Sequence, residues 1–323
     1  MLSRVADHLY WMSRYLERAE HTARLIGVHL DLMLDQTPAT AASRRERLAA
    51  SLATPLPPEN LQDDYSMTQA LTFSPANKSS IVACIAAARE NAQNVRERIS
   101  SEMWEQINQL YLSLKQANPE KIWRTEPHRF FRSVKEGAHL FQGLTDSTMN
   151  HGEGWHFIQV GRFIERAGAT AALLDVHYSA ANQSLQNFST PDDYLEWIGL
   201  LRSCTAFEAY CKVYTADFQP RTVAEFLLLN HEFPHSVYFA VNEIQTALHG
   251  IAEATETRKV GRVYRLVGRL RASFDFDQID DIMTAGLHLY LQDIQSQCRQ
   301  IHEALYQTYI TYPIEAALAA EGR

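Results

Sequence analysis

The stretch Trp11-Met-Ser-Arg-Tyr-Leu-Glu-Arg-Ala-Glu-His-Thr-Ala-Arg-Leu-Ile26 recurs 148 residues later as Gln159-Val-Gly-Arg-Phe-Ile-Glu-Arg-Ala-Gly-Ala-Thr-Ala-Ala-Leu-Leu174. Seven positions are identical in the two copies: Arg14, Glu17, Arg18, Ala19, Thr22, Ala23 and Leu25 in the first, and Arg162, Glu165, Arg166, Ala167, Thr170, Ala171 and Leu173 in the second. The same offset aligns His8 with His156. A repeat of this length indicates that the chain is a duplication.

Each copy has the pattern of a long helix, because its apolar residues recur at spacings of three and four. These residues are Leu9, Met12, Leu16, Ala19, Ala23, Ile26, Leu30 and Met33 in the first copy, and Phe157, Val160, Ile164, Ala167, Ala171, Leu174 and Tyr178 in the second. The alanines allow another helix to approach closely, which would leave the neighbouring Arg and Glu side chains partly buried. Buried charges are costly unless they are paired. The spacing of Arg14 and Glu17 allows them to pair along one helix.

The remainder of the chain is also expected to be helical. No segment shows sustained alternation of apolar and polar residues or a two-residue hairpin turn, so we predict an all-α protein. Further helices are predicted over residues 63–72, 81–98, 128–149, 191–214, 253–271 and 277–312. Ser79 or Ser80 is a candidate N-cap, and Ser236 precedes a later helix in a similar way. We predict two sequence-related halves, residues 1–150 and 151–323, packed with pseudo-two-fold symmetry into one bundle-like body.

Composition and charge exclude several classes of protein. The chain has 38 acidic and 30 basic residues, a balance that argues against a general nucleic-acid binder. No run of about 18 apolar residues is present, so no membrane span is expected. The first residues have no signal-peptide core, which favours a cytoplasmic protein. The four cysteines form no metal-type pair and are expected to be reduced thiols that pack as small hydrophobic side chains.

Several stretches resemble the bacterial alpha-E family, a predicted helical domain named for its Glu-Arg motif. They are residues 2–20, 98–105, 161–167, 200–210 and 223–229, and the resemblance extends over essentially the whole chain. Members of this family typically accompany, or are fused to, a circularly permuted ATP-grasp ligase and a transglutaminase-like protein. The resemblance therefore implies that this chain is the non-ATP-binding component of a system that ligates peptides or amides, with those two proteins as its partners.

The candidate site consists of the charged and polar residues of both copies, together with the repeated histidines. These residues are Arg14, Glu17, Arg18, Thr22, Arg162, Glu165, Arg166, Thr170, His8 and His156. In one interpretation their charges tie neighbouring helices together through ion pairs. In the other they line a pocket in which guanidinium groups hold a carboxylate or phosphate. No catalytic residue is assigned, because acid–base catalysis requires convergent geometry.

Metal and nucleotide chemistry have weaker support in the sequence. Glu136 and His139, and likewise Glu232 and His235, have the Glu-x-x-His spacing of di-iron helical bundles, but Pro234 makes the second a poor helical ligand pair. We expect no metal and no cofactor. Neither a Gly-x-Ser-x-Gly elbow nor a Gly-rich phosphate loop is present.

Three functional hypotheses follow. In the first, the chain is a binding and assembly component that docks a cytosolic ATP-grasp ligase. In the second, it is an enzyme that acts on an amino acid or peptide through its paired Glu and Arg residues. In the third, it is a ferritin-like metalloprotein.

Overall fold

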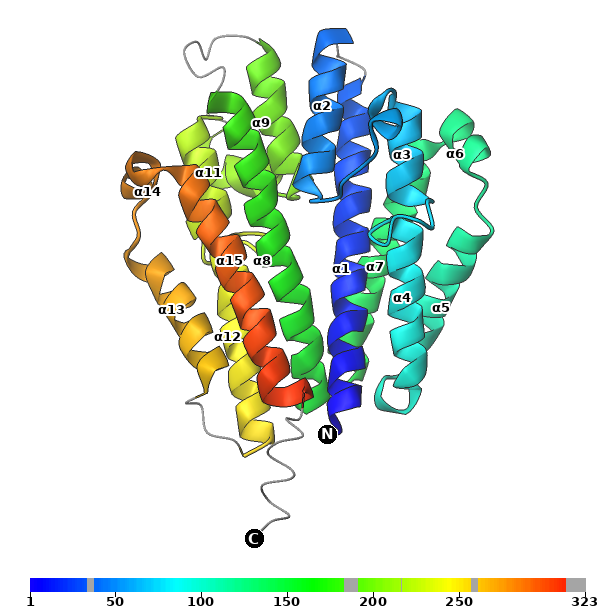
Figure 1. Cartoon of the computed structure of the whole chain (residues 1–323), viewed down its shortest axis with the longest axis vertical. Helices are drawn as coiled ribbons and strands as arrows, with labels where there is room; N and C mark the ends of the chain where they lie inside the picture. Colours follow the sequence, from blue (N-terminus) through cyan, green and yellow to red (C-terminus); the bar gives the residue numbers. More distant parts are fainter. Residues whose placement is uncertain (34–37, 183–190, 216, 257–260, 312–323) are drawn as a thin grey trace.

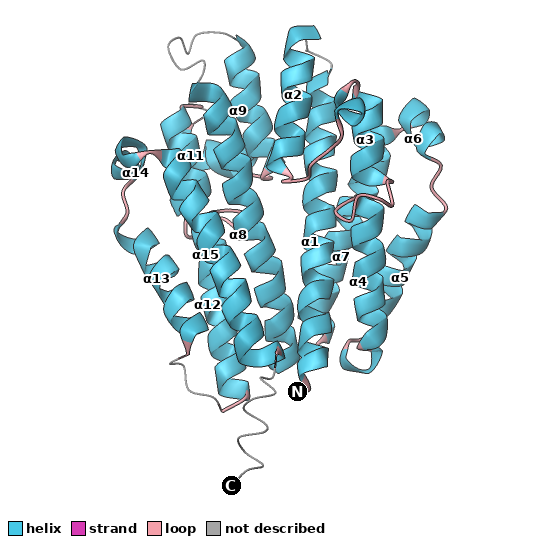
Figure 2. Cartoon of the chain, in the orientation of Figure 1, coloured by secondary structure: helices cyan, strands magenta, loops and turns pink. Residues whose placement is uncertain are grey.

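A computed structural model describes residues 1–33, 38–182, 191–215, 217–256 and 261–311 of the chain. In these residues the regular structure consists of α-helices, short 3-10 segments and one π-helical turn, and it contains no strand (Figure 2). The all-α prediction is therefore confirmed.

The helices of the first half are α1 (Ser3–Leu32), α2 (Pro38–Ser51), η2 (Pro58–Leu61), α3 (Asp64–Thr72), α4 (Ile81–Asn94), η3 (Arg96–Arg98), α5 (Ser101–Lys115), α6 (Pro119–Thr125) and α7 (Pro127–Thr148). Those of the second half are α8 (Glu153–Asn182), α9 (Pro191–Ser203), α10 (Phe207–Tyr214), α11 (Pro220–Leu229), α12 (Val237–Ala254), α13 (Arg262–Phe276), α14 (Ile279–Ala285), α15 (Leu287–Leu305) and the π-helical turn η4 (Tyr306–Ile310).

The two longest helices, α1 and α8, lie side by side at the centre of the molecule (Figure 1). Helix α1 also packs against α4 and α7, and α5 covers those two. In the other half α8 packs against α12 and α15, and α13 covers them. Helix α2 contacts α8, while α9 contacts α1. Each half thus contacts the central helix of the other half. The pseudo-two-fold relation and the boundary at residue 150 remain predictions.

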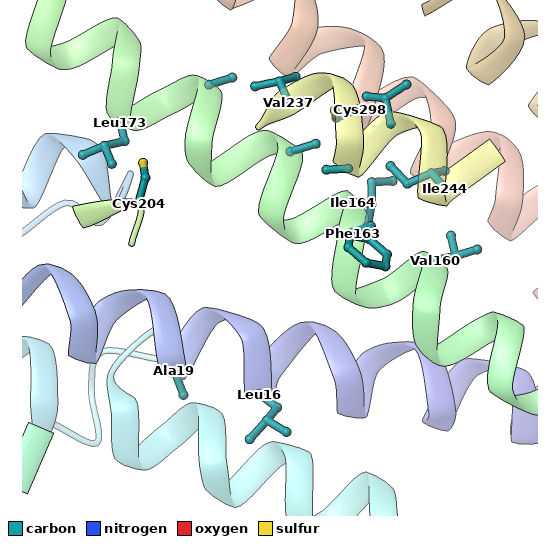
Figure 3. Packing of buried hydrophobic residues seen from close by; sticks show 14 of the residues in the cluster. Leu16, Ala19, Val160, Phe163, Ile164, Leu173, Cys204, Val237, Ile244 and Cys298 are labelled. Carbon is teal, nitrogen blue, oxygen red and sulfur yellow. The ribbon is translucent and has the colours of Figure 1, made fainter. Parts of the chain in front are cut away.

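The apolar faces read from the sequence form the core. Leu9, Met12 and Ile26 of α1 are fully buried. Figure 3 shows Leu16 directed from α1 towards α4, and Val160 of α8 close to α12. Buried apolar side chains from both halves form one connected cluster. Full burial of a side chain of this size contributes about 1.5–3 kcal/mol, so this shared core holds the two central helices together.

A serine caps one helix in each half. The Ser80 hydroxyl accepts a hydrogen bond from the backbone N–H of Ala83 at the start of α4. The Ser236 hydroxyl accepts one from the N–H of Phe239 at the start of α12. Each cap satisfies a backbone donor that would otherwise have no partner within the helix. The prediction of Ser80 as an N-cap is therefore confirmed.

Four predicted helices differ from those in the structure. The helix predicted over residues 81–98 ends at Asn94, and Arg96–Arg98 form the 3-10 segment η3. The helix predicted over residues 191–214 is divided into α9 and α10, because Thr205 adopts a left-handed conformation with φ 51°. The helix predicted over 277–312 is divided into α14 and α15 at Gly286, where φ is 109°. The helix predicted over 253–271 is wrong in its bounds, because α12 continues to Ala254 and α13 begins only at Arg262.

The four cysteines are free, and Cys84, Cys204 and Cys298 are buried. Burial raises the pKa of each of these three thiols to about 12. They are therefore protonated at neutral pH, in keeping with a packing role. Across the described residues, every helix falls short of the length or apolarity needed to cross a membrane.

Candidate functional site

The repeated motifs meet because α1 and α8 run in the same direction from one end of the molecule. The amino group of Met1 lies 2.9 Å from Glu153 Oε2, at the start of α8. About two turns of α8 further on, the two backbones come very close: a Cβ atom added to Gly161 would lie 2.4 Å from the carbonyl oxygen of Tyr10. Only glycine permits this approach, which brings the motif residues of the two helices within reach of one another.

Glu165 of α8 is held by two arginines of α1. Arg14 donates from Nε to Glu165 Oε2 at 2.8 Å, and Arg18 donates from Nε to Glu165 Oε1 at 2.6 Å. Burial alone would raise the pKa of this carboxyl group, but the two guanidinium groups outweigh burial and lower the pKa to about 2. Glu165 is therefore ionised and fully engaged at neutral pH.

Glu17 of α1 is held in the reciprocal way by α8. Arg166 donates from Nε to Glu17 Oε1 at 2.6 Å and from Nη2 to Oε2 at 3.0 Å. Gln142 of α7 donates to the same carboxylate at 3.1 Å. Glu17 and Arg166 are only 2% and 5% exposed, so this is a buried bidentate ion pair.

The pairs cross between helices instead of running along one helix. Arg14 binds Glu165, and Glu17 binds Arg166, so the pairing of Arg14 with Glu17 that their spacing allows is not the one formed. The cross-pairing arises because α1 and α8 approach closely along their small residues, which places each glutamate nearer to the other helix's arginines. The prediction that these charges are buried and paired is correct.

A third charged group lies along α1 itself. Arg24 donates from Nε to Glu20 Oε1 at 3.0 Å and from Nη2 to Oε2 at 3.2 Å. Arg24 Nη2 also lies 3.2 Å from His21 Nδ1. All three side chains are buried, so this network stiffens the helix beside the crossed pairs.

These residues surround a cavity of about 400 Å³ between α1, α8 and α15. Its lining includes Arg14, Glu17, Arg18, His21, Thr22, Arg24, Ser51, Thr54, Ser79, Glu165, Arg166, Thr170, Gln295, Cys298, Arg299 and His302. Five arginines and two glutamates are among them, an excess of three positive charges, which Glu20 behind the wall reduces to two. The volume is in the range of small-molecule sites. A chain of net charge −8 thus contains a positively charged cavity.

Arg14 and Arg166 already use all of their guanidinium nitrogens. Arg14 binds Glu165 and Tyr10, and Arg166 binds Glu17 and the carbonyl oxygen of Pro234. Arg18 uses only Nε, and within the described residues its terminal nitrogens have no partner. Arg299, exposed at the rim, likewise has no ion pair among them. Within this part of the chain the unpaired donors are therefore most numerous on Arg18 and Arg299, while Arg24 retains Nη1.

The structure brings most of the predicted site residues into this cavity and places three outside its lining. Those in the lining are Arg14, Glu17, Arg18, Thr22, Glu165, Arg166 and Thr170. His8 instead bonds to Asn91 Oδ1 at 2.8 Å, and His156 packs against Gly250 of α12. Arg162 lies 4.0 Å from Glu17 Oε2, and burial followed by the charge of Arg166 lowers its pKa to about 10.

Sequence reasoning missed the two histidines and two of the arginines that line the cavity. His21 and Arg24 lie on α1, and Arg299 and His302 come from α15. For His21 a signal existed, because it follows Glu17 by four residues and so lies on the same flank of the helix. The residues of α15 gave no signal, since only the tertiary fold brings them to α1.

The described residues contain no group of three or more His, Cys, Asp or Glu side chains that could hold a metal ion. His139, one of the Glu-x-x-His residues, lies 3.6 Å from Glu20 Oε1, and Glu20 is already bound to Arg24. No observation in this part of the chain therefore favours the ferritin-like hypothesis.

Comparison with known proteins gives one family and a small set of relatives. A family model named Alpha-E, described as a predicted alpha-helical domain with a conserved ER motif, matches residues 1–310. The chain is 23% identical over 340 residues to the uncharacterized protein Rv2567 of Mycobacterium tuberculosis, and 22% identical over 340 residues to the uncharacterized protein Mb2597 of Mycobacterium bovis. Both matches cover 96% of this chain and 37% of the relative. No solved structure gives a significant match.

Proposed function

The chain belongs to the Alpha-E family, and on that premise we propose that it is the non-ATP-binding component of a cytoplasmic peptide- or amide-ligation system. In this proposal the cavity between α1 and α8 holds an acidic group of a molecule that the system joins. The partners are a circularly permuted ATP-grasp ligase and a transglutaminase-like protein, as the family resemblance implies. The pseudo-two-fold duplication belongs to the same proposal, since it supplies the two crossed motifs that form the wall.

The observation that carries the binding role is the surplus of cationic donors in the cavity. Arg18 and Arg299 retain guanidinium nitrogens without partners in the described residues, and such groups bind carboxylate and phosphate strongly. The carboxyl end of α2 also reaches the wall at Ser51–Thr54, and its carbonyl groups carry partial negative charge. The affinity for an anion therefore depends on the arginine side chains.

The state of the glutamates favours binding over acid–base catalysis. Efficient general acids and bases have pKa values near the working pH, whereas the pKa of Glu165 is about 2. Glu17 is buried in a bidentate pair with Arg166. Both carboxylates are already held by arginines, so we place binding ahead of the enzymatic hypothesis.

The length of the relatives supports a role beside other protein segments. The chain spans 37% of the length of the mycobacterial proteins that it matches. In those proteins the helical region is one part of a longer polypeptide. This arrangement is compatible with a component that works next to another polypeptide.

The binding role is tested by isothermal titration calorimetry with L-glutamate and inorganic phosphate at low ionic strength. Arg299→Gln removes one unpaired guanidinium group without breaking an ion pair, so we expect affinity to fall roughly tenfold or more. Arg129→Gln, on the exposed surface of α7, is the matched control and should bind as the wild type does. Equal affinities in Arg299→Gln and the wild type would contradict the binding role.

The ligation role needs a separate experiment. The tagged chain is purified from its native cells, and co-purifying proteins are identified by mass spectrometry. We expect an ATP-grasp ligase to be recovered, and we expect its ATP-dependent amide formation to increase when the purified chain is added. A ligase whose turnover is indifferent to the chain would contradict this role and leave the anion-binding role standing.

A further inference from the structure

His21 has a buried nitrogen that the crossed ion pairs do not use. The side chain lies in the cavity wall and is 6% exposed. Its Nε2 atom is buried and makes no hydrogen bond to any described residue. A buried donor without a partner costs free energy. An orphaned polar atom on a residue that lines a positively charged cavity therefore needs an explanation.

The neighbouring network determines which nitrogen of His21 carries the proton. A guanidinium group only donates hydrogen bonds, so Arg24 Nη2 must be the donor in its 3.2 Å contact with His21 Nδ1. Nδ1 is then the acceptor, and the proton of the neutral ring is on Nε2. Glu20 holds Arg24 in place through two hydrogen bonds. In the described part of the chain, the network thus leaves Nε2–H as the unpaired donor of a residue that lines the cavity.

The ring is neutral over the physiological range. Burial, followed by the positive charge of Arg24, lowers the pKa of His21 to about 3. Other charged or titratable groups that act on it are Glu20 on α1, Glu165 and Arg166 on α8, and His235 before α12. The donor character of Nε2 is therefore unchanged between pH 5 and pH 8.

We infer that His21 Nε2–H donates a hydrogen bond to an ionised oxygen of the ligand, and that His21 with Arg18 and Arg299 selects an oxyanion that presents unprotonated oxygens to these three groups. This inference rests on the proposed binding function and specifies its ligand chemistry. The three groups offer only donors, so the bound group must accept on every side. A carboxylate or a phosphate meets this requirement, whereas an ammonium or a protonated acid brings a hydrogen towards another donor.

Two conservative substitutions separate this role from a structural one. His21→Asn retains an acceptor near the position of Nδ1, for Arg24, but has no donor near the position of Nε2. His21→Gln retains a donor near the position of Nε2. If His21 serves only to hold Arg24, we expect His21→Asn to preserve ligand affinity better than His21→Gln. If His21 binds the ligand, we expect His21→Gln to preserve it better.

The experiment is calorimetric titration of each variant with L-glutamate and with inorganic phosphate, after circular dichroism has shown that the variant is folded. We expect His21→Gln to bind within about threefold of the wild type, and His21→Asn to bind roughly tenfold more weakly. His231→Leu, an exposed histidine outside the cavity lining, is the control and should bind normally. The probe that binds more tightly distinguishes a carboxylate ligand from a phosphate.

A second measurement does not depend on a substitution. In ¹⁵N-histidine spectra of the wild-type protein, we expect His21 to show the Nε2–H tautomer from pH 5 to pH 8, and its proton to move downfield as the probe is added. An Nδ1–H tautomer, or normal affinity in His21→Asn, would overturn the inference. If Arg299→Gln weakens binding and His21→Asn does not, the inference fails while the proposed function stands. If the wild type binds neither probe, both fail.

Discussion

At the scale of single residues, the crossed ion pairs combine the two interpretations that the sequence left open. Glu17 and Glu165 tie α1 to α8 through arginines of the opposite helix, as expected of a structural network. The same side chains also line a cavity in which Arg18 retains unpaired donors. Because both carboxylates are bound by arginines of the opposite helix, the glutamates position the arginines and leave anion binding to those with unused nitrogens.

Glu17 is expected to be critical for stability. Glu17→Ala strands the buried guanidinium of Arg166, so we expect the free energy of unfolding to fall by about 3–5 kcal/mol, the cost of breaking a buried pair on one side. Urea denaturation followed by circular dichroism measures this change. Glu232→Ala, on an exposed loop, should change stability by less than about 0.5 kcal/mol. A loss below about 1 kcal/mol in Glu17→Ala would show that Arg166 finds another partner.

The lowered pKa of Glu165 predicts that the protein loses stability in acid. Its pKa is about 2 in the folded protein against an ordinary value of 4.5, so the folded state favours the ionised form. This contribution is fully present above about pH 4.5 and is lost as the pH falls from there towards 2, with a total on the order of 3 kcal/mol. The pKa of His21 is lowered to about 3, so this histidine adds a further loss of stability as the pH falls below about 6.5.

The contribution of Glu165 to the pH dependence of stability is measured by comparing two proteins. Urea denaturation of the wild type and of Glu165→Gln is compared at pH values from 7 to 3. We expect the stability gap between them to narrow as the pH falls below 4.5, because only the wild type loses an ionised carboxylate there. A gap that stays constant down to pH 3 would mean that Glu165 keeps its ordinary pKa.

The part of the site that could be predicted from sequence is the part that is repeated. Arg14, Glu17 and Arg18 were identified because the second copy has the same residues 148 positions later. His21 and Arg24 align with Ala169 and Ala172, so a comparison of the two copies does not identify them as site residues. The groups with unused donors are thus partly unique to one copy, and their role depends on distances that a repeat does not contain.

At the scale of elements, the long helices could be predicted from the spacing of apolar residues, whereas the breaks between helices could not. The apolar spacing of α1 and α8 continues for many turns, so their existence and burial were predictable. The break at Thr205 depends on one residue in a left-handed conformation, which is uncommon for a side chain branched at Cβ. The short helix α6, which begins at Pro119, is too short to show a period and was not predicted.

The close approach of α1 and α8 is expected to require Gly161. In Gly161→Ala the added methyl group would collide with the carbonyl oxygen of Tyr10, which is backbone and cannot turn aside. We expect the melting temperature to fall and the loss of stability to reach at least about 1–3 kcal/mol. Gly27→Ala, also in a central helix but with no atom within 4 Å of the added methyl, should leave stability unchanged or raise it by up to about 1 kcal/mol. Equal effects in the two variants would refute the packing argument.

At the scale of the whole molecule, one connected core and the crossed pairs join the two halves. The face of α1 that packs on α8 lies inside this core, and Glu17 has its arginine partner in the other half. Residues 1–150 alone would therefore expose an apolar face and a carboxylate without its partner. The halves depend on each other energetically as well as spatially.

This dependence predicts a single unfolding transition for the full chain. Differential scanning calorimetry should show one peak whose calorimetric and van't Hoff enthalpies agree. Residues 1–150, expressed separately, should show no cooperative transition as a monomer. Two resolved peaks in the full chain, or a cooperative transition in the isolated half, would show that the halves are independent domains.

The crossing of the ion pairs also has a consequence for the evolution of the two copies of the motif. Duplicated segments ordinarily diverge independently, because each carries its own complement of interactions. Here Glu17 depends on Arg166 and Glu165 on Arg14, so a change in one segment removes the partner of a charge in the other. We therefore expect the two copies of the motif to evolve jointly, because a substitution in either copy is limited by its ion-pair partner in the other.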